Sequence, residues 1–330
     1  MQKRLLGRSG LSVSALGLGT VELGMDYGLR VPNAYEQPTE TDAIRIVHAA
    51  LAHGINLIDT ARAYGESEAI VGRALRGRRE QVVLATKVKT QGPDRIALSS
   101  DHLKQHMLDS LDTSLRLLQT DCIDLWQIHT IDDPFLSQAD IAAEVFYAAK
   151  KSGKVRAIGG STYGTAMPLK ALSTDLFDVL QVGYSVFDQR QADETFPLAA
   201  QKNVGIVARS LLLQGVLTER GDYLPEPLAV LRERSRQFRQ LAAEVQPSAS
   251  AAQLALAFGL AHPQIGTALI GVRTESELKE NLRAAHTTLP EALLAELYAL
   301  RIDDANLLDP RWWEQFLQDQ TLVHKDPAQP

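Results

Sequence analysis

Short apolar runs alternate with amphipathic stretches along most of the chain. Each run is rich in aliphatic and β-branched residues, which predicts strands over 14–19, 55–59, 82–87, 123–129, 155–159, 178–182, 204–208 and 267–271. Apolar positions recur at helical spacing over 41–53, 67–75, 101–118, 138–151, 167–172, 194–202, 250–261 and 276–285. Eight strand–helix units are the number that closes a parallel barrel with an interior small enough to be filled by side chains. The pattern therefore predicts one (β/α)8 barrel domain over 1–330.

An open doubly wound sheet is the main structural alternative, and it usually carries a glycine-rich turn after its first strand. No G-x-G-x-x-G occurs here, which favours the barrel. Three segments lie outside the eight units. Residues 1–13 predict a β-hairpin at the bottom of the barrel, and residues 211–249 form a long loop with a helix over 227–245. The long loop 211–249 is typical of a lid. Residues 290–330 contain a further helix and a tail.

Composition narrows the function classes. The 330 residues include 22% charged residues and carry a formal net charge of -6, which argues against a nucleic-acid surface. The single cysteine, Cys122, allows no internal disulfide. The N-terminus lacks a secretory apolar region, and the apolar stretch 254–261 is too short to cross a bilayer. We therefore expect a soluble cytoplasmic protein with no membrane or nucleic-acid partner; its oligomeric state stays open.

Four chemically active side chains lie at or just beyond predicted strand ends. Asp59, Lys87 and His129 each end a strand, and Tyr64 follows the first of these. The C-terminal ends of all strands in a parallel barrel open onto one face, so the four should converge. Each residue alone would more often have a structural role. Their joint occurrence at consecutive strand ends favours a site that moves a proton without a metal or a covalent nucleophile.

The expected chemistry centres on Tyr64. A tyrosine has a reference pKa of about 10, and a nearby ammonium lowers it. We expect Lys87, held by Asp59, to lower the pKa of Tyr64. The phenol would then protonate a carbonyl oxygen as a hydride reaches the carbonyl carbon, and His129 would donate a hydrogen bond to that oxygen. No metal site is predicted, because the histidines form no H-E-x-x-H motif.

These residues carry a resemblance to a known family. The segments 55–75, 82–87, 114–129, 153–162 and 269–281 resemble the aldo-keto reductase superfamily, in the right order over nearly the whole chain. The D-T-x-x-x-Y-G-x-S-E run at 59–68 is the most specific piece. The resemblance implies a (β/α)8 barrel, a nicotinamide nucleotide bound without a Rossmann fold, and a catalytic tetrad of Asp59, Tyr64, Lys87 and His129.

The resemblance also implies a nucleotide site. Its residues would be Gly19, Thr20, Asp59, Ser161, Thr162, Gln181, Arg209, Ser210, Leu212, Gln214, Gly215, Gly271, Val272, Arg273, Glu277 and Asn281. Ser161, Thr162 and Gln181 would hold the nicotinamide carboxamide, and Arg209 replaces the aromatic that many relatives stack on the ring. Glu277 would repel a 2′-phosphate whereas Arg273 would attract it. NADP is the usual choice in the family, and NAD remains open.

The substrate site is less defined by sequence. Val21, Tyr27, Trp126, Tyr163 and Trp312 are the candidate pocket residues. The expected activity is NAD(P)H-dependent interconversion of an alcohol with an aldehyde, ketone or sugar carbonyl. One alternative is a dehydrogenase or reductase dedicated to aldoses or keto-sugars. Another, of a different class, is a nucleotide-binding regulatory subunit with slow turnover.

Overall fold

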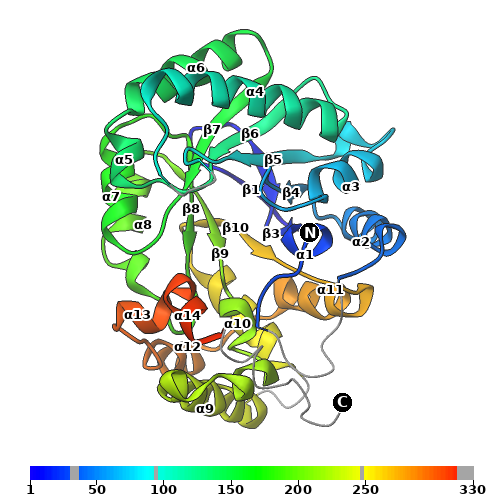
Figure 1. Cartoon of the computed structure of the whole chain (residues 1–330). Helices are drawn as coiled ribbons and strands as arrows, with labels where there is room; N and C mark the ends of the chain where they lie inside the picture. Colours follow the sequence, from blue (N-terminus) through cyan, green and yellow to red (C-terminus); the bar gives the residue numbers. More distant parts are fainter. Residues whose placement is uncertain (30–36, 93–95, 246–248, 318–330) are drawn as a thin grey trace, which may run out of the picture.

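The structure is a computed structural model that describes residues 1–29, 37–92, 96–245 and 249–317, so the end of the predicted tail lies outside the described residues. Eight parallel strands form a closed barrel (Figure 1). In chain order they are β3 (Leu16–Gly19), β4 (Leu57–Asp59), β5 (Val83–Val88), β6 (Ile123–Ile128), β7 (Val155–Ser161), β8 (Val179–Gly183), β9 (Gly205–Arg209) and β10 (Ile265–Ile270). Pairing of β10 with β3 closes the ring. The predicted barrel is confirmed.

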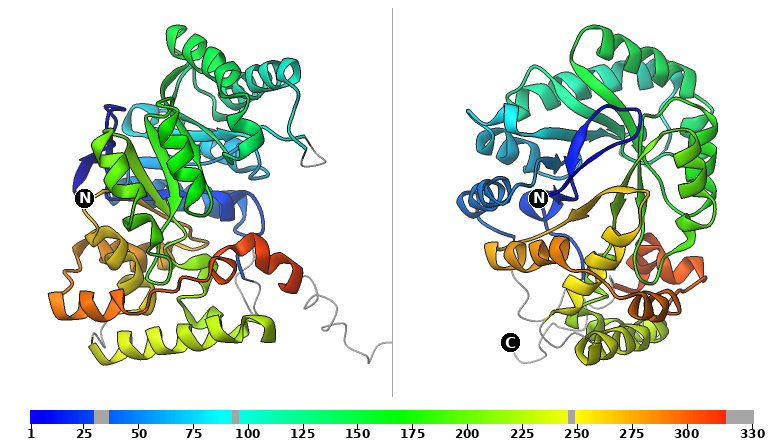
Figure 2. Two further views of the ribbon diagram at one scale, coloured as in Figure 1. Left: turned by 90° about the vertical axis from the view of Figure 1, so that its left-hand side faces the viewer. Right: turned by 180° about the vertical axis from the view of Figure 1, so that it is seen from behind.

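Helices surround the strands as an outer layer (Figures 1 and 2). The connecting helices are α2 (Glu40–Ala52), α3 (Ser67–Ala74), α4 (Ser100–Leu118), α6 (Ala139–Lys151), α7 (Ala166–Ser173), α8 (Thr195–Gln201), α10 (Ala251–Ala261) and α11 (Glu275–Leu282). Their apolar stripes face the strands; α4, for example, buries Leu103, Met107 and Leu111. The helical spacing in the sequence predicted these elements because it reports this one-sided burial.

Shorter elements fill the connections. The additional α-helices are α1 (Val21–Gly24), α5 (Asp133–Leu136), α9 (Ala229–Val245), α12 (Glu291–Tyr298), α13 (Ala305–Leu308) and α14 (Pro310–Leu317). The 3-10 turns are η1 (Arg79–Gln81), η2 (Arg190–Ala192), η3 (Leu213–Gly215), η4 (Glu219–Tyr223), η5 (Glu226–Leu228) and η6 (Arg283–His286). The long loop after β9 therefore contains three 3-10 turns and the predicted helix α9.

The N-terminal hairpin closes one end of the barrel. Strands β1 (Lys3–Leu5) and β2 (Ser12–Ser14) pair antiparallel, as predicted. The hairpin residues Leu6, Leu11 and Val13 are buried with the inward side chains of the barrel strands, among them Leu57 and Leu125. Because this end is filled by apolar side chains, ligands can enter only at the opposite, C-terminal end of the strands.

Trp126 lies in the protein core rather than in a substrate pocket, which corrects the prediction. Its ring is fully buried and packs edge-on against Phe146 of α6, with centroids 4.9 Å apart. Side chains alternate between the two faces of a strand. Gln127, the next residue on β6, points into the barrel and bonds to Asp59. Trp126 therefore points outward, into the layer between strands and helices.

Candidate active site

A buried ion pair forms the centre of the C-terminal mouth of the barrel. Asp59, the last residue of β4, accepts a hydrogen bond from Nζ of Lys87 on β5. Its second oxygen accepts from Nε2 of Gln127 at 3.1 Å and from Nε2 of Gln181 at 3.0 Å. Lys87 Nζ also donates to the carbonyl oxygen of Thr60 at 3.0 Å. Both charges are buried, so each depends on these partners.

Tyr64 and His129 lie beside this pair. Their ring centroids are 5.4 Å apart with an interplanar angle of 83°. Lys87 Nζ lies 5.0 Å from the centroid of the Tyr64 ring. In the described part of the chain, His129 Nδ1 is buried and has no hydrogen-bond partner. The structure thus brings together the four residues that the sequence singled out.

The expectation that Lys87 lowers the pKa of Tyr64 is wrong. Burial and the negative charge of Asp59 raise the pKa of Tyr64 above its usual value, with Arg209 opposing. The reason is that the charge of Lys87 is matched by Asp59, which it contacts directly. Tyr64 is therefore a neutral phenol at neutral pH, the form that can donate a proton.

His129 is also held neutral. Burial, followed by the positive charges of Lys87, Lys89 and Arg209, lowers the pKa of His129 to about 3. Two neutral hydrogen-bonding groups, a phenol and an imidazole, therefore face the mouth beside a neutralised ion pair. Such a site can stabilise negative charge on a substrate oxygen by donated hydrogen bonds.

Close backbone packing fixes the position of Tyr64. A Cβ added to Gly24, at the end of α1, would lie 2.1 Å from the carbonyl oxygen of Tyr64. A Cβ on Gly65, whose φ is +52°, would lie 2.4 Å from the carbonyl oxygen of Gly24. The two glycines therefore let α1 and the loop after β4 touch through their backbones.

The remaining polar residues of the D-T-x-x-x-Y-G-x-S-E run hold that loop. Ser67 Oγ lies 2.9 Å from Thr60 Oγ1 and donates to Thr20. The buried carboxylate of Glu68 accepts from Thr86 Oγ1 at 2.6 Å and pairs with Arg62 at 2.6 Å. The motif therefore contains one candidate catalytic residue, Tyr64, and the residues that hold its loop in place.

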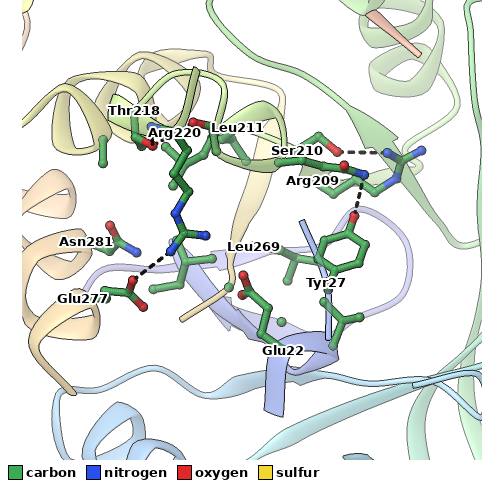
Figure 3. A pocket seen from close by; sticks show the side chains of 18 of the residues that line it. Glu22, Tyr27, Arg209, Ser210, Leu211, Thr218, Arg220, Leu269, Glu277 and Asn281 are labelled. Carbon is green, nitrogen blue, oxygen red and sulfur yellow. Dashed lines mark hydrogen bonds and ion pairs between the residues drawn. The ribbon is translucent and has the colours of Figure 1, made fainter. Parts of the chain in front are cut away.

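A cavity of about 460 Å³ extends from this site to α11 (Figure 3). The predicted nucleotide-site residues that line it are Gly19, Thr20, Asp59, Gln181, Arg209, Ser210, Leu212, Gln214, Gly215, Gly271, Glu277 and Asn281. Val21 and Tyr27, predicted for substrate, line it as well. Ser161 and Thr162 are buried at the end of β7 and just after it, Val272 is fully buried, and Arg273 is nearly so.

Charged groups from three elements meet at the far end of this cavity. Glu277 of α11 accepts from the backbone N–H of Arg273 at 2.7 Å and lies 3.5 Å from Arg220. The Arg273 guanidinium bonds to the carbonyl oxygen of Tyr27 and lies 3.9 Å from Glu22. Figure 3 shows Glu22, Arg220 and Glu277 around the same space. Sequence reasoning missed Arg220 and Glu22, because neither lies at a strand end or in a recognisable motif.

A second cavity, of about 1300 Å³, lies beside the mouth. Apolar atoms make up the larger part of its exposed lining, and the polar residues along it include Arg62, Lys89, Thr90, Gln91, Asp109, Ser110, Thr113, Thr130, Asp132, Tyr163 and Arg311. Of the predicted substrate residues, Tyr163 lies here. Trp312 does not line the first or the second cavity; it packs against Phe316, with centroids 4.7 Å apart. Its neighbour Arg311, which the sequence did not single out, lines the second cavity instead.

The family model described as the aldo/keto reductase family matches residues 15–302. The chain belongs to the aldo/keto reductase family. The oxidoreductase YqkF of Bacillus subtilis, described as uncharacterized, is 31% identical. The alignment covers 87% of this chain and 92% of YqkF. L-galactose dehydrogenase of Arabidopsis thaliana is 31% identical, and the alignment covers 93% of this chain and 92% of that protein.

Solved structures agree with this assignment. The holo form of the aldo-keto reductase AKR11C1 from Bacillus halodurans is 30% identical in sequence and superposes with a TM-score of 0.75. The match covers 92% of this chain and 99% of the AKR11C1 chain. This aldo/keto reductase is accordingly an NAD(P)-dependent oxidoreductase. Among the helices that the structure describes, none has the length and apolarity needed to cross a bilayer.

We predict that Gly24→Ala lowers kcat by about 100-fold, because the new methyl group displaces the Tyr64 backbone and small misplacements of a catalytic group are costly. Steady-state carbonyl reduction checks this, with circular dichroism to confirm the fold. Gly77→Ala is the control, since a Cβ there meets nothing within 4 Å although its φ is +70°. A Gly24→Ala enzyme with wild-type kcat would show that this contact does not position Tyr64.

We predict that His129 stays unprotonated well below pH 6.5, and that this costs stability in acid. Its folded-state pKa lies below the unfolded value of 6.5, so the unfolded chain binds more protons between these values. The free energy of unfolding should therefore decrease as the pH drops from 6.5 to 4. This decrease should be larger in wild type than in His129→Gln. Urea titrations at several pH values measure this. Equal pH slopes, or an imidazole NMR titration near pH 6.5, would contradict it.

Proposed function

We propose that this aldo/keto reductase interconverts a carbonyl and an alcohol with Tyr64 as the proton donor and acceptor. The observation that carries this proposal is the meeting of Tyr64, His129 and the Asp59–Lys87 pair at the only open end of the barrel. A bound nicotinamide supplies or takes the hydride. Tyr64 gives its phenolic proton to the carbonyl oxygen, and His129, neutral at working pH, donates a hydrogen bond to the same oxygen.

The residues present suit a nicotinamide nucleotide. Thr162 Oγ1, His129 Nδ1 and Arg209 Nε are buried without a partner in the described part of the protein, and all three lie at this end of the barrel. Buried polar groups of this kind are normally satisfied by a ligand or by water. In our proposal the nucleotide lies along the cavity of about 460 Å³, from Gln181 and Arg209 at the catalytic end to Asn281.

We propose that the substrate is a small polyhydroxylated aldehyde or ketone, such as a sugar. Thr90, Gln91, Thr130 and Asp132 place hydroxyl, amide and carboxylate groups along the second cavity, where Gln91 Nε2 donates to Asp132 at 2.6 Å. Such groups can recognise several hydroxyls at once. The sugar activity named for the Arabidopsis relative supports this reading.

Replacing Tyr64 by Phe tests the central proposal. We expect kcat to fall by about 10²- to 10⁴-fold, because the ring stays but its proton is lost. Absorbance of the reduced nicotinamide measures turnover with glyceraldehyde and with propanal, which differ in hydroxyls but not in carbon number. A higher kcat/KM for glyceraldehyde supports the sugar-like substrate. Tight nucleotide binding without turnover would instead favour a regulatory subunit.

For the nucleotide, we propose a preference for NAD(H) over NADP(H). Glu22, Glu219, Glu277 and Glu280 all line the cavity, and Arg220 lies 3.5 Å from Glu277. The nearly buried Arg273 guanidinium bonds to the carbonyl oxygen of Tyr27 and lies 3.9 Å from Glu22, so it offsets part of this charge. Negative charge of this kind opposes a 2′-phosphate, whereas a carboxylate can accept a hydrogen bond from a 2′-hydroxyl.

Glu277→Gln should raise the affinity for NADPH relative to NADH by about ten-fold, which corresponds to about 1.4 kcal/mol. The cause is removal of one negative charge near the 2′ position. Dissociation constants from fluorescence titration measure it. The control is Glu275→Gln, an exposed residue in the first turn of the same helix, which should leave the ratio unchanged. A wild-type enzyme that already binds NADPH more tightly than NADH would refute the preference.

A further inference from the structure

One tyrosine ring contacts two arginines from distant parts of the chain. Tyr163 follows β7, and the Cζ of Arg209, at the end of β9, lies 4.1 Å from its ring centroid. The Cζ of Arg311, in α14, lies 4.0 Å from the same centroid. Both distances are well inside the range of about 6 Å in which a guanidinium is attracted to an aromatic ring. Tyr163 therefore connects a strand end of the barrel to the C-terminal helix.

These three residues contribute to the linings of both cavities, and Tyr163 and Arg209 also share a third cavity of about 70 Å³. Arg209 lines the nucleotide cavity, whereas Tyr163 and Arg311 line the second one. Arg209 is further held by a bond from Nη2 to the carbonyl oxygen of Thr162 at 2.7 Å and one from Nη1 to Ser210 Oγ at 3.1 Å. Each of these bonds restrains one end of the guanidinium, and the ring of Tyr163 supports its plane.

Asp309 offsets the two positive charges. Its Oδ1 accepts from Nε of Arg311 at 2.9 Å. Although burial acts in the opposite direction, the bonds from Arg311 and the charge of Arg209 hold the pKa of Asp309 below its usual range. Asp309 therefore stays ionised between the arginines, which reduces their mutual repulsion.

The position of Arg311 is set by the fold. The residue belongs to α14, and two positions further along Trp313 is fully buried in the main core. The backbone of this helix is therefore anchored independently of the Arg311 side chain. A substitution at 311 can remove the cation without removing the anchor.

We propose that Tyr163 and Arg311 are positioning residues that hold the Arg209 guanidinium at the nucleotide cavity, so that nucleotide affinity depends on α14. This inference rests on the nucleotide role proposed above for Arg209. Coupling between two sites is reciprocal, so bound nucleotide also stabilises α14 at the edge of the substrate cavity.

A double-mutant cycle tests this proposal. Dissociation constants for NADH and NADPH would be measured by fluorescence titration, without substrate, for wild type, Arg311→Met, Arg209→Met and the double variant. Arg311→Met loses one cation–π contact of about 1 kcal/mol. We therefore expect this variant to bind the nucleotide about five-fold more weakly than wild type. Because Arg311 acts through Arg209, the double variant should bind no more weakly than Arg209→Met alone.

Conservative variants separate positioning from general damage. Tyr163→Phe keeps the ring and should bind nucleotide like wild type, whereas Tyr163→Leu should resemble Arg311→Met. Arg311→Lys should recover part of the affinity. Arg45→Met, on α2 and largely exposed, is the control and should change nothing. Wild-type affinity in Arg311→Met, or losses that add in the double variant, would overturn the inference. Failure of wild type to bind either nucleotide would instead overturn the proposed function.

Discussion

The carboxylate of Asp59 is the interaction on which the active site depends. It accepts hydrogen bonds from side chains on three other strands, namely Lys87 on β5, Gln127 on β6 and Gln181 on β8. A buried charge is tolerated only when it is paired and hydrogen-bonded, so all four groups must stay in register. The barrel supplies that register, because parallel pairing fixes the relative heights of the strand ends. The same carboxylate also joins β4 and β8, which are not neighbours in the sheet.

This arrangement decides how the neighbouring groups ionise. Since Asp59 neutralises Lys87, the ammonium does not draw Tyr64 toward its phenolate. Instead, burial and the negative charge of Asp59 favour the phenol. The same burial, with the surrounding cations, removes the proton from His129. The site therefore holds a neutral phenol that can donate a proton.

The sequence predicted the barrel and the four convergent residues because both follow from local pattern: strand ends of one parallel barrel share one face. It misassigned Trp126, because a run of apolar residues does not reveal which side chains of a buried strand point inward. It also gave the wrong direction for the pKa of Tyr64, since that depends on which partner neutralises Lys87. Arg220 and Arg311 lie in a 3-10 turn and a C-terminal helix. Their approach to the cavities results from tertiary packing that local pattern does not encode.

The two cavities are supported by different kinds of structure, and this has a consequence for specificity. The proposed catalytic residues lie at or near strand ends whose positions the closed barrel fixes. The walls come instead from connections: η4 supplies Arg220 and α14 supplies Arg311, neither of which pairs with the sheet. A change in these connections can alter the bound molecule without moving Asp59 or Lys87. Tyr163 and Arg209 lie where the two parts meet, directly after β7 and at the end of β9. These two side chains therefore link the outer segment α14 to the strand ends of the barrel.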